Sequence, residues 1–491
     1  MAYTFDLPYS PTYFHDMNPD YLAWIISNNG LHPPSVNNVL EIGCGNGLNL
    51  IIPAINSSTK FVGLDPNPTH INFAKKITDR VGITSNIDFR CEYVQAHEPV
   101  SGYDYIHLHG VLSWIDIESL PHLTRKISEW LNPGGMLYVS YNTKAGWSEL
   151  QAWRTLILAS CSTETVSSKR IQKLRTLTSR LVEVQGERLE ESMRRRYEKI
   201  LKLSDWYSAH EYLNSTWNLF SPSEVINAFG ESSVTYIGNL EPLVNFKGLC
   251  LPASELALID EISESVAMSE DMFTLLTKQG FRKDIFIKGP VRLPEGDRSF
   301  ENYFQLTKVR EITTPVSITG FYAKGDLSKE ISKYLDSNIE VGSWIQWDKI
   351  VSDLGNMGHS KLNVSAVCQA LISNGALRLV DTRRLNKDAT SKQWKMFNQL
   401  IIDKVFDSDP LEFWLDERRG TAIAVPRLQL AIEYLRRNQE SLDARNIVTS
   451  LNKRGITLSR QGEDNSDQMQ VAERQLQQFM TTRRLIDAVT G

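Results

Sequence analysis

The sequence lacks the features of a membrane-spanning, secreted or metal-binding chain. No apolar run among its 491 residues approaches the roughly 18–20 residues that cross a bilayer. Residues 1–6 lack the charged and apolar regions of a signal peptide. The five cysteines are scattered and form no C-x-x-C pair, which argues against a zinc site or a disulfide framework. We therefore expect a cytoplasmic protein with reduced cysteines, no metal and no membrane partner.

A strong charge of either sign is also missing. Lys and Arg number 53 against 58 Asp and Glu, for a net charge of −5, which argues against a generic polyanion binder. One stretch departs from this balance, since residues 165–202 hold eleven Lys and Arg against five Glu. Helical apolar spacing in the same stretch favours a solvated helix face over a nucleic-acid surface. We do not expect nucleic acid to be the partner.

What the sequence does contain is an alternation of strands and helices in its first third. Short apolar runs bounded by turn residues predict five strands, at 38–42, 61–64, 87–91, 103–108 and 136–141. Helical spacing lies between some of them, as at 69–78 and 123–131. Such alternation is typical of a parallel sheet covered by helices on both faces. The predicted fold class is therefore α/β.

The length of the chain predicts two or three domains. Residues 148–213 have helical spacing throughout, and two later strands, at 234–238 and 284–288, flank a helical region that includes 254–268. Five parallel strands with a late pair predict a Rossmann-like sheet with a helical insertion. Farther on, a strand at 376–380 beside charged turns suggests a winged-helix-like module, and 405–491 is predicted to be helical and polar. We expect domains at 1–147, 148–310 and 311–491, the last mostly helical.

The first predicted strand ends in an E-x-G-x-G-x-G turn formed by Glu41, Gly43, Gly45 and Gly47. A dinucleotide-binding turn, G-x-G-x-x-G, would have its third glycine at position 48, where this chain has leucine. An acid beside the turn would repel a pyrophosphate, whereas it would attract a sulfonium or an ammonium group. The turn therefore favours S-adenosylmethionine over NAD as the cofactor.

Ligands of an open parallel sheet bind at the carboxyl ends of its strands. Glu41 and the turn 43–47, Asn46 included, are placed to hold the methionine part of the cofactor, because glycines allow close approach of the backbone. Asp65, at the end of the second strand, is placed to accept hydrogen bonds from both ribose hydroxyls. Glycine turns and strand-end acids also occur in other α/β folds. Here, however, Glu41, the three glycines and Asp65 occur together at the ends of the first two predicted strands.

The fourth predicted strand ends at two histidines, His107 and His109, which strand alternation places on one face of the sheet. Seven of the nine histidines lie in the first 122 residues, so a metal site is an alternative interpretation. Asp104 would face the other way, however, and no facial triad is predicted. We expect histidines that are hydrogen-bonded at the strand end.

Methyl transfer from a sulfonium needs an in-line approach and a dry site. A lysine acceptor must also lose its proton, which costs about 4 kcal/mol at pH ~7.4 from a reference pKa near 10.4. Aromatic walls lower this cost, and the candidates are Trp114, Tyr141, Trp147 and Tyr212. The N-terminal aromatics that could close over the cofactor are Tyr9, Tyr13 and Phe14. Aromatic side chains at strand ends are as often simple core residues.

Several segments resemble bacterial protein lysine methyltransferases that carry a methyltransferase regulatory domain. These segments are 41–45 with Asn49, 61–65, 104–114, 138–147, 210–213 and 281–286. The most specific are the H-G-V-L-S-W run at 109–114 and the S-Y-N-T-x-x-G-W run at 140–147. The likeness covers about residues 5–310 well and the rest weakly.

The resemblance implies a class I methyltransferase core that binds S-adenosylmethionine, a middle domain that shapes the substrate cleft, and a C-terminal module. It implies a lysine side chain of a protein as the methyl acceptor, since characterised members methylate bacterial surface proteins. Beyond the turn and Asp65, we assign cofactor contacts to Asn49, Pro66, Tyr13 and His109. We assign catalytic roles at the acceptor site to Trp114, Tyr141, Trp147 and His109.

The chain departs from the family pattern at Lys144-Ala145, where an aromatic residue and a proline are expected. This departure changes the wall of the acceptor site, so a small-molecule or natural-product methyltransferase stays open as an alternative. A non-catalytic scaffold that binds S-adenosylmethionine is a second one. A DNA amino-methyltransferase is disfavoured, because 109–112 reads H-G-V-L instead of an Asp/Asn-Pro-Pro-aromatic turn. The sequence leaves the oligomeric state open, a homodimer included.

Overall fold

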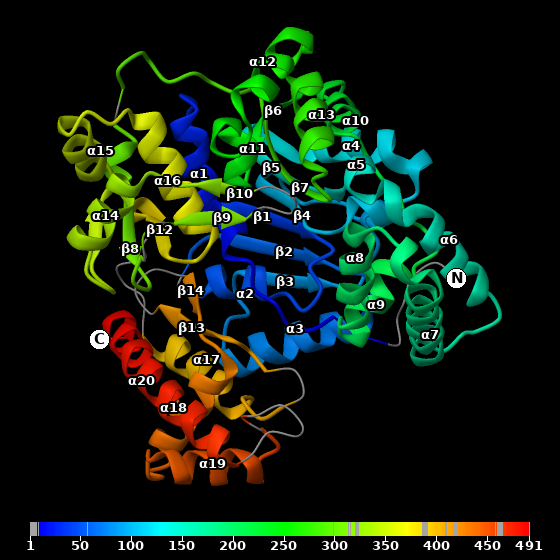
Figure 1. The fold of residues 1–491 in the computed structure, drawn as a ribbon. Coiled ribbons are helices and arrows are strands. Elements are labelled where there is room, and N and C mark those ends of the chain that lie inside the picture. The colour runs from blue at the N-terminus through cyan, green and yellow to red at the C-terminus, as the bar shows by residue number, and fades with distance from the viewer. Residues whose placement is uncertain are drawn as a thin grey trace.

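A seven-stranded sheet forms the centre of the computed structural model (Figure 1), which describes residues 7, 9–55, 57–297, 299–312, 314, 316–319, 324–384, 391–407, 410–416, 421–456, 458 and 465–490. Its strand order is β3-β2-β1-β4-β5-β7-β6. The strands are β1 (Asn38–Ile42), β2 (Lys60–Leu64), β3 (Ile87–Arg90), β4 (Tyr103–Leu108), β5 (Leu131–Asn142), β6 (Val234–Asn239) and β7 (Phe281–Lys288). β1 to β5 pair in parallel, whereas β7 is antiparallel to both β5 and β6. The predicted parallel core with a late pair of strands is confirmed.

The strand order reverses between β1 and β4, which makes their carboxyl ends the switch point where open α/β sheets bind ligands. β5 and β7 begin earlier than predicted, at Leu131 and Phe281. In β5 the early start brings Leu131 opposite Tyr103 before the register shifts. Residues 132–135 therefore lie inside the strand as an irregularity.

Helices cover both faces of the sheet, as the sequence pattern predicts. Alternation along β1 sends Val39 to one apolar core and Leu40 to another. The helices packed on the Val39 face are α1 (Pro19–Asn28), α2 (Leu48–Ala54) and α3 (Pro68–Val81). Those on the Leu40 face are α4 (Leu120–Trp130) and α10 (Pro222–Gly230). Burial on both faces explains why the central strands read as near-continuous apolar runs.

A helical insertion follows β5 and has an apolar core of its own (Figure 1). Its helices are α5 (Lys144–Trp147), α6 (Gln151–Ser160), α7 (Ser167–Gln185), α8 (Glu191–Leu201) and α9 (Asp205–Tyr212). The core contains Trp153, Leu174 and Ile200, one from each of the three longest helices. The insertion predicted at 148–213 is thus confirmed.

Three helices lie between β6 and β7: α11 (Pro242–Asn245), α12 (Ala253–Ile262) and α13 (Val266–Thr277). The continuous helical region predicted around 254–268 is divided, because Ser265 caps a new helix and its hydroxyl accepts a hydrogen bond from the Met268 amide. Serine at such a position competes with the helix backbone, which ends one helix and starts another.

The region after β7 contains a three-stranded sheet in the order β11-β8-β12. Its elements are β8 (Phe304–Lys308), the hairpin β9 (Ser317–Thr319) and β10 (Lys324–Asp326), α14 (Lys329–Asn338), β11 (Trp344–Gln346), α15 (Trp347–Asn356), α16 (Lys361–Ser373) and β12 (Leu377–Asp381). The order helix, strand, helix, helix, strand is that of a winged helix, but the third strand, β8, comes from upstream. The strand predicted at 376–380 corresponds to β12.

The tail is not purely helical and polar, so that prediction is wrong. Its elements are α17 (Ser391–Asp403), β13 (Phe413–Asp416), β14 (Thr421–Ala424), α18 (Arg427–Arg437), α19 (Ala444–Lys453) and α20 (Asn465–Thr490). β13 and β14 form an antiparallel hairpin that buries Trp414 and Ile423. These short apolar runs were overlooked because polar segments flank them.

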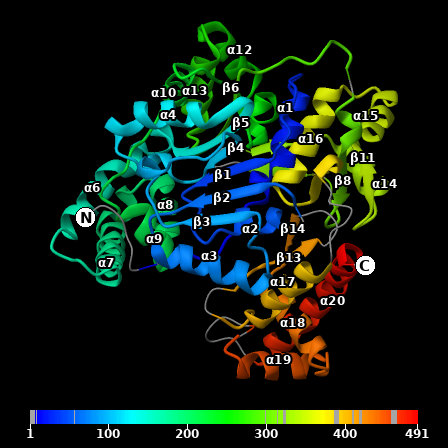
Figure 2. The ribbon, with the colours of Figure 1, turned by 180° about the vertical axis from the view of Figure 1, so that it is seen from behind.

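The region after β7 packs against the first domain. Figures 1 and 2 both show α17 beside α3, and the Gln393 side chain donates to the Gly82 carbonyl at 2.9 Å. Trp24 of α1 meets Trp347 of α15 edge to face, with ring centroids 5.1 Å apart. No helix within the described residues is long and apolar enough to cross a bilayer.

Candidate functional site

The glycine turn between β1 and α2 has the backbone geometry that its sequence requires. Gly43, Gly45 and Gly47 have φ angles of 74°, 50° and 75°, in the left-handed region that favours glycine. A Cβ at Gly43 would lie 2.4 Å from Val111 Cγ2, whereas one at Gly45 would meet no atom within 4 Å. The turn therefore packs tightly at one glycine and leaves open space at the next.

Asp65, at the end of β2, is 4% exposed and ties the turn to the neighbouring strand. Its Oδ2 accepts a hydrogen bond from the Gly45 amide at 3.0 Å, and its Oδ1 accepts one from the Asn67 amide at 2.8 Å. His70 Nδ1 lies 3.2 Å from the same Oδ1. Because the Tyr9 amide donates to His70 Nε2, Nδ1 carries the ring proton and donates to Asp65. Pro66 is half-buried in the same turn.

Glu41 is 1% exposed and lies beneath the turn. The Asn49 side chain donates to its Oε1 at 3.0 Å, but its Oε2 has no hydrogen-bond partner among the described residues. The pKa of Glu41 is raised to about 8, mainly by burial; the Asn49 hydrogen bond opposes this shift and the nearby Asp65 charge adds to it. A buried acid with one unsatisfied oxygen is suited to pair with a cationic ligand.

The N-terminal segment 9–14 crosses the glycine turn and is fixed by three hydrogen bonds, one each to the turn, to α2 and to α3. Asn46 Nδ2 donates to the Tyr9 carbonyl at 2.7 Å, and the Phe14 amide donates to Asn49 Oδ1 at 2.9 Å. The Tyr9 amide donates to His70 at 3.1 Å. The placement of Tyr9 and Phe14 agrees with segments that close over a bound cofactor.

Tyr13 does not lie with them. Its ring packs against Phe413 of the C-terminal hairpin, with centroids 6.0 Å apart, and lines a cavity of about 540 Å³ on the other side of the segment. Neither Glu41 nor Asp65 lines this cavity. The cofactor contact predicted for Tyr13 does not fit this position, because alternation along an extended segment sends neighbouring side chains to opposite sides.

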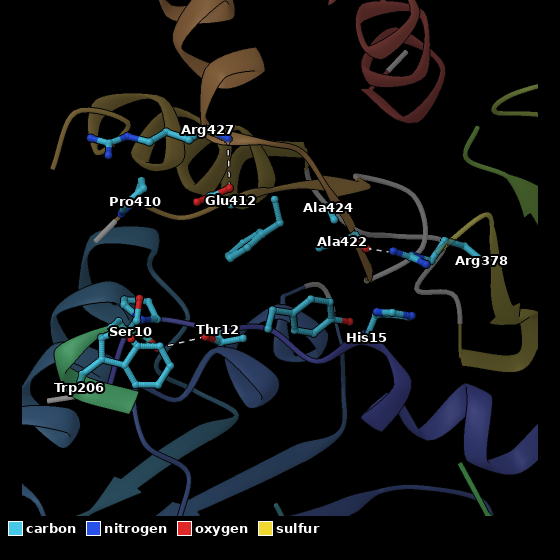
Figure 3. A pocket seen from close by; sticks show the side chains of 14 residues that line it. Ser10, Thr12, His15, Trp206, Arg378, Pro410, Glu412, Ala422, Ala424 and Arg427 are labelled. Carbon is cyan, nitrogen blue, oxygen red and sulfur yellow. Dashed lines mark hydrogen bonds between the residues drawn. The ribbon is translucent and has the colours of Figure 1, made fainter. Parts of the chain in front are cut away.

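The cavity in Figure 3 lies between the N-terminal segment, Trp206 of α9 and the hairpin β13–β14. Arg378 of β12 stands at one end, where its guanidinium donates to the Leu377 carbonyl at 3.1 Å and the Ala422 carbonyl at 3.5 Å. Burial lowers the pKa of Arg378 to about 10. The segment 9–14 therefore has the glycine turn on one side and this cavity on the other.

His107 and His109 lie on one face of the sheet at the end of β4, as alternation predicts. His109 Nδ1 is 2.7 Å from the Tyr138 hydroxyl, and the ring packs against Phe14 with centroids 4.2 Å apart. His107 Nδ1 lies 3.7 Å from Glu41 Oε1 and has no hydrogen-bond partner within the described part of the chain. Burial lowers the pKa of each histidine to about 3, so both are neutral at physiological pH.

Within the described ranges, no group of three or more His, Cys, Asp or Glu, these histidines included, is arranged to hold a metal ion. Asp104 accepts hydrogen bonds from the Asn37 and Asn38 amides, at 2.8 and 3.1 Å. This carboxylate therefore joins the start of β1 to β4 at the amino ends of the strands.

The four predicted acceptor-site aromatics do not form one group, although Trp147 and Tyr212 pack together. Tyr141 is fully buried in the core on the opposite face from His109, where its hydroxyl donates to Asp284 Oδ2 at 2.5 Å. Trp114 is half-buried in a short 3-10 helix, Leu112–Trp114, that follows β4. The catalytic role predicted for Tyr141 does not fit this position, because parity along β5 directs it away from the ligand-binding face.

Trp147 belongs to the core of the helical insertion. It is 7% exposed, its Nε1 donates to the Gly280 carbonyl at 3.0 Å, and its ring packs against Tyr212 and Trp217. Lys144, where the chain departs from the family pattern, forms an ion pair with Glu224 of α10. The departure therefore places a charge at the contact with α10.

The position of Trp147 yields a stability prediction. Trp147→Ala should lower the free energy of unfolding by about 3–5 kcal/mol, because it removes a large buried ring and its hydrogen bond. Leu156→Ala, on the exposed face of α6, should change it by less than about 0.5 kcal/mol. Denaturant unfolding measures both. A Trp147→Ala protein that keeps its stability but loses methyl transfer would support an acceptor wall instead of a core residue.

Sequence reasoning missed several residues that converge on this edge. Tyr138, Ser140 and Asn142 alternate along β5 toward the face of His107 and His109, and Ser140 Oγ accepts from the Gly110 amide at 2.7 Å. Strand parity was the signal that could have found them. His70 and Asn67 were also missed, because no local pattern marks a residue that supports Asp65 from the next helix.

Comparison with known proteins agrees with this geometry. A family model described as a methyltransferase domain matches residues 40–137. A second, described as a predicted methyltransferase regulatory domain, matches residues 204–288. The first contains the glycine turn, Asp65 and the end of β4, and the second contains α9 and the late strands β6 and β7. Both segments of the regulatory domain that the sequence indicated, 210–213 and 281–286, fall inside the second match.

The whole chain has the fold of a solved structure. PKMT2 from Rickettsia typhi in complex with AdoHcy aligns with a TM-score of 0.70 over 99% of this chain and 100% of that chain, at 20% identity. An uncharacterized protein of Synechocystis is 24% identical over 443 residues, which cover 87% of this chain and 86% of that protein. A malonyl-[acyl-carrier protein] O-methyltransferase of Ilyobacter polytropus is 29% identical over 121 residues, 23% of this chain and 42% of that protein. PKMT2 and the Synechocystis protein are therefore similar to this chain over most of its length, whereas the O-methyltransferase is similar over a short part of it.

Proposed function

We propose that this S-adenosylmethionine-dependent methyltransferase, which combines a methyltransferase domain with a methyltransferase regulatory domain, methylates lysine side chains of a protein. The observation that carries the proposal is the full-length fold, which it shares with PKMT2, a protein lysine methyltransferase. The O-methyltransferase relative is similar over only 23% of this chain, and so it supports the chemistry but not an acceptor class.

The residues of the site fit the cofactor. The open side of Gly45 leaves room for close approach, and the unsatisfied Oε2 of Glu41 offers an acceptor to a positive group. Asp65 presents a buried carboxylate at the end of β2, where it can accept from ribose hydroxyls. Bound S-adenosylmethionine supplies an electrophilic methyl group on a sulfonium. We propose that Glu41, Asn46, Asn49, Asp65 and the glycine turn hold it.

The second part of the site is the acceptor side, at the carboxyl ends of β4 and β5. The regulatory-domain helix α9 packs over this edge, so an acceptor must pass between the two matched regions. A lysine side chain is long and lies on the surface of its protein, so it can reach into such an edge. The five cysteines are all free thiols, which is compatible with action in the cytoplasm.

The test is transfer of label from methyl-tritiated S-adenosylmethionine into a bacterial lysate that is separated into protein, nucleic-acid and small-molecule fractions. We expect the label in protein, and we expect it to be lost when the lysines of the lysate are first blocked by exhaustive N-acetylation. Label in the small-molecule fraction would replace this proposal with a natural-product methyltransferase. Cofactor binding without transfer to any fraction would point to a binding scaffold.

A further inference from the structure

A carboxylate to which no role has been assigned so far lies at the acceptor edge. Helix α9 places Glu211 against the end of β5, where Asn142 Nδ2 donates to Glu211 Oε1 at 2.9 Å. Asn142 is itself fixed, because its amide donates to Ser113 Oγ at 2.9 Å. Ser113 follows β4, the parallel neighbour of β5. Glu211 therefore lies over the carboxyl ends of the two strands that border the acceptor side.

Among the described residues, one oxygen of Glu211 is engaged and the other is not. Across the part of the chain that the structure describes, its Oε2 accepts no hydrogen bond, and no Lys, Arg or His lies within ion-pair distance of it. Arg154 of α6 is the cation whose charge reaches it, but that guanidinium donates to the Asn214 carbonyl and stacks on Trp217 at 4.3 Å. A carboxylate with one oxygen anchored and the other open is suited to receive a cation.

Glu211 is also connected to the cofactor side. Its neighbour His210 stacks on Tyr9, with ring centroids 3.9 Å apart and planes 23° apart. The Tyr9 carbonyl in turn accepts from Asn46 of the glycine turn. Two contacts thus link the helix that carries Glu211 to the turn that we assign to the cofactor. The β1–β2 end of the edge belongs to Asp65, which leaves the β4–β5 end, with Glu211, for the acceptor.

We propose that Glu211 binds the ammonium group of the substrate lysine and accepts its proton before methyl transfer. This inference rests on the proposed lysine specificity. A proton of the ammonium passes to Glu211 Oε2, which leaves a lone pair on the lysine nitrogen. That nitrogen then forms a bond to the methyl carbon as the S–C bond breaks. The electron pair of the S–C bond stays on sulfur, which becomes a neutral thioether. The positive charge moves to the methylated amine, and the proton on Glu211 leaves to solvent.

Burial and the surrounding groups determine the pKa of Glu211. Burial raises this pKa, the hydrogen bond from Asn142 and the charge of Arg154 lower it, and the resulting value is about 7. The phenols of Tyr207 and Tyr212, from the same helix, are neutral at physiological pH, since burial raises their pKa values above 10. Glu211 is therefore partly ionised near neutrality and takes up the proton when a lysine ammonium donates it.

The pH dependence of transfer separates this role from passive binding. At saturating cofactor and limiting lysate protein, the wild-type rate should level off above about pH 7, because Glu211 removes the proton inside the complex. In Glu211→Gln the lysine must arrive neutral, so the rate should keep rising about tenfold per pH unit up to the lysine pKa near 10.4. At pH 7.5 the variant should be about 100- to 1,000-fold slower.

Glutamine keeps the oxygen that accepts from Asn142, so the fold should survive the change. The matched control is Asp205→Asn on the same helix, an exposed carboxylate that pairs with Arg175 at 2.8 Å and should leave the rate unchanged. A second readout is binding of n-butylammonium, a lysine side-chain mimic, by ligand-observed NMR with S-adenosylhomocysteine present. Glu211→Gln should abolish that binding and keep its affinity for S-adenosylhomocysteine.

Three results would overturn the proposal. They are a normal rate in Glu211→Gln, a wild-type rate that rises log-linearly through pH 9, and a slow variant that still binds n-butylammonium as the wild type does. Failure of the lysine assignment is distinguishable, because the wild-type label would then appear outside methyl-lysine. If Glu211→Gln does not fold, the wild-type pH profile and n-butylammonium titration still decide.

Discussion

Asp65→Ala is expected to weaken S-adenosylmethionine binding by about 100-fold, since each hydrogen bond to a charged acceptor contributes roughly 1.5–3 kcal/mol. The carboxylate is 4% exposed, and one of its oxygens also accepts from the Gly45 amide. The substitution therefore removes the ribose partner and loosens the glycine turn together. Isothermal titration calorimetry measures the affinity, and thermal unfolding checks that the domain stays folded.

Two variants separate these contributions. Asp65→Asn keeps an oxygen that can accept from Gly45 and should recover about tenfold of the lost affinity. Asp88→Ala, on the neighbouring strand β3, removes an exposed carboxylate that pairs only with Arg90 in the described residues and should leave the affinity unchanged. Wild-type affinity in Asp65→Ala would remove Asp65 from the cofactor site.

Glu41 is expected to make cofactor binding depend on pH. Its pKa is about 8 before a ligand binds, so the carboxyl is mostly protonated at pH 6–7. A cationic ligand favours the ionised form, and binding must then release a proton. The dissociation constant should fall by up to about tenfold per pH unit between pH 6 and 7.5. Glu41→Gln should bind weakly with no such dependence, although the Asn49 hydrogen bond to Oε1 can persist.

The Glu41 carboxyl is also expected to make the stability of the folded protein depend on pH. The folded pKa of Glu41 is raised from 4.5 to about 8, so the folded protein holds a proton that the unfolded chain releases between these values. Stability from this group should therefore fall as pH rises from about 4.5 to 8. Unfolding of the ligand-free protein should show Glu41→Gln gaining on the wild type across this range. A pH-independent difference between the two would contradict a buried, neutral Glu41.

The parts of the fold that were predicted correctly around the candidate site lie close together in the sequence. β1, the glycine turn and Asp65 span 38–65, and the backbone geometry of that segment follows from glycine and from strand alternation. Local pattern and physical chemistry act on the same residues there. The two strands that follow the insertion were found for the same reason, because each is a compact apolar run.

The errors concern contacts between distant segments. The N-terminal segment lies over the glycine turn because Asn46 and Asn49 bond to its backbone, and no local pattern announces such bonds. Glu211 meets Asn142 across 69 residues of chain. Tyr141 was placed at the acceptor site by residue type, although its parity on β5 sends it to the opposite core. Residue type indicates chemistry, but the neighbouring strand or helix decides which atoms meet.

The most direct test of the central claim is amino-acid analysis of the labelled lysate protein after acid hydrolysis, with Asp65→Ala as the inactive control. We predict that tritium from the methyl group is recovered as methyl-lysine with the wild type and falls to background with the variant. Label recovered in another methylated residue, or lost as volatile methanol as it would be from a carboxyl ester, would contradict lysine methylation by this protein.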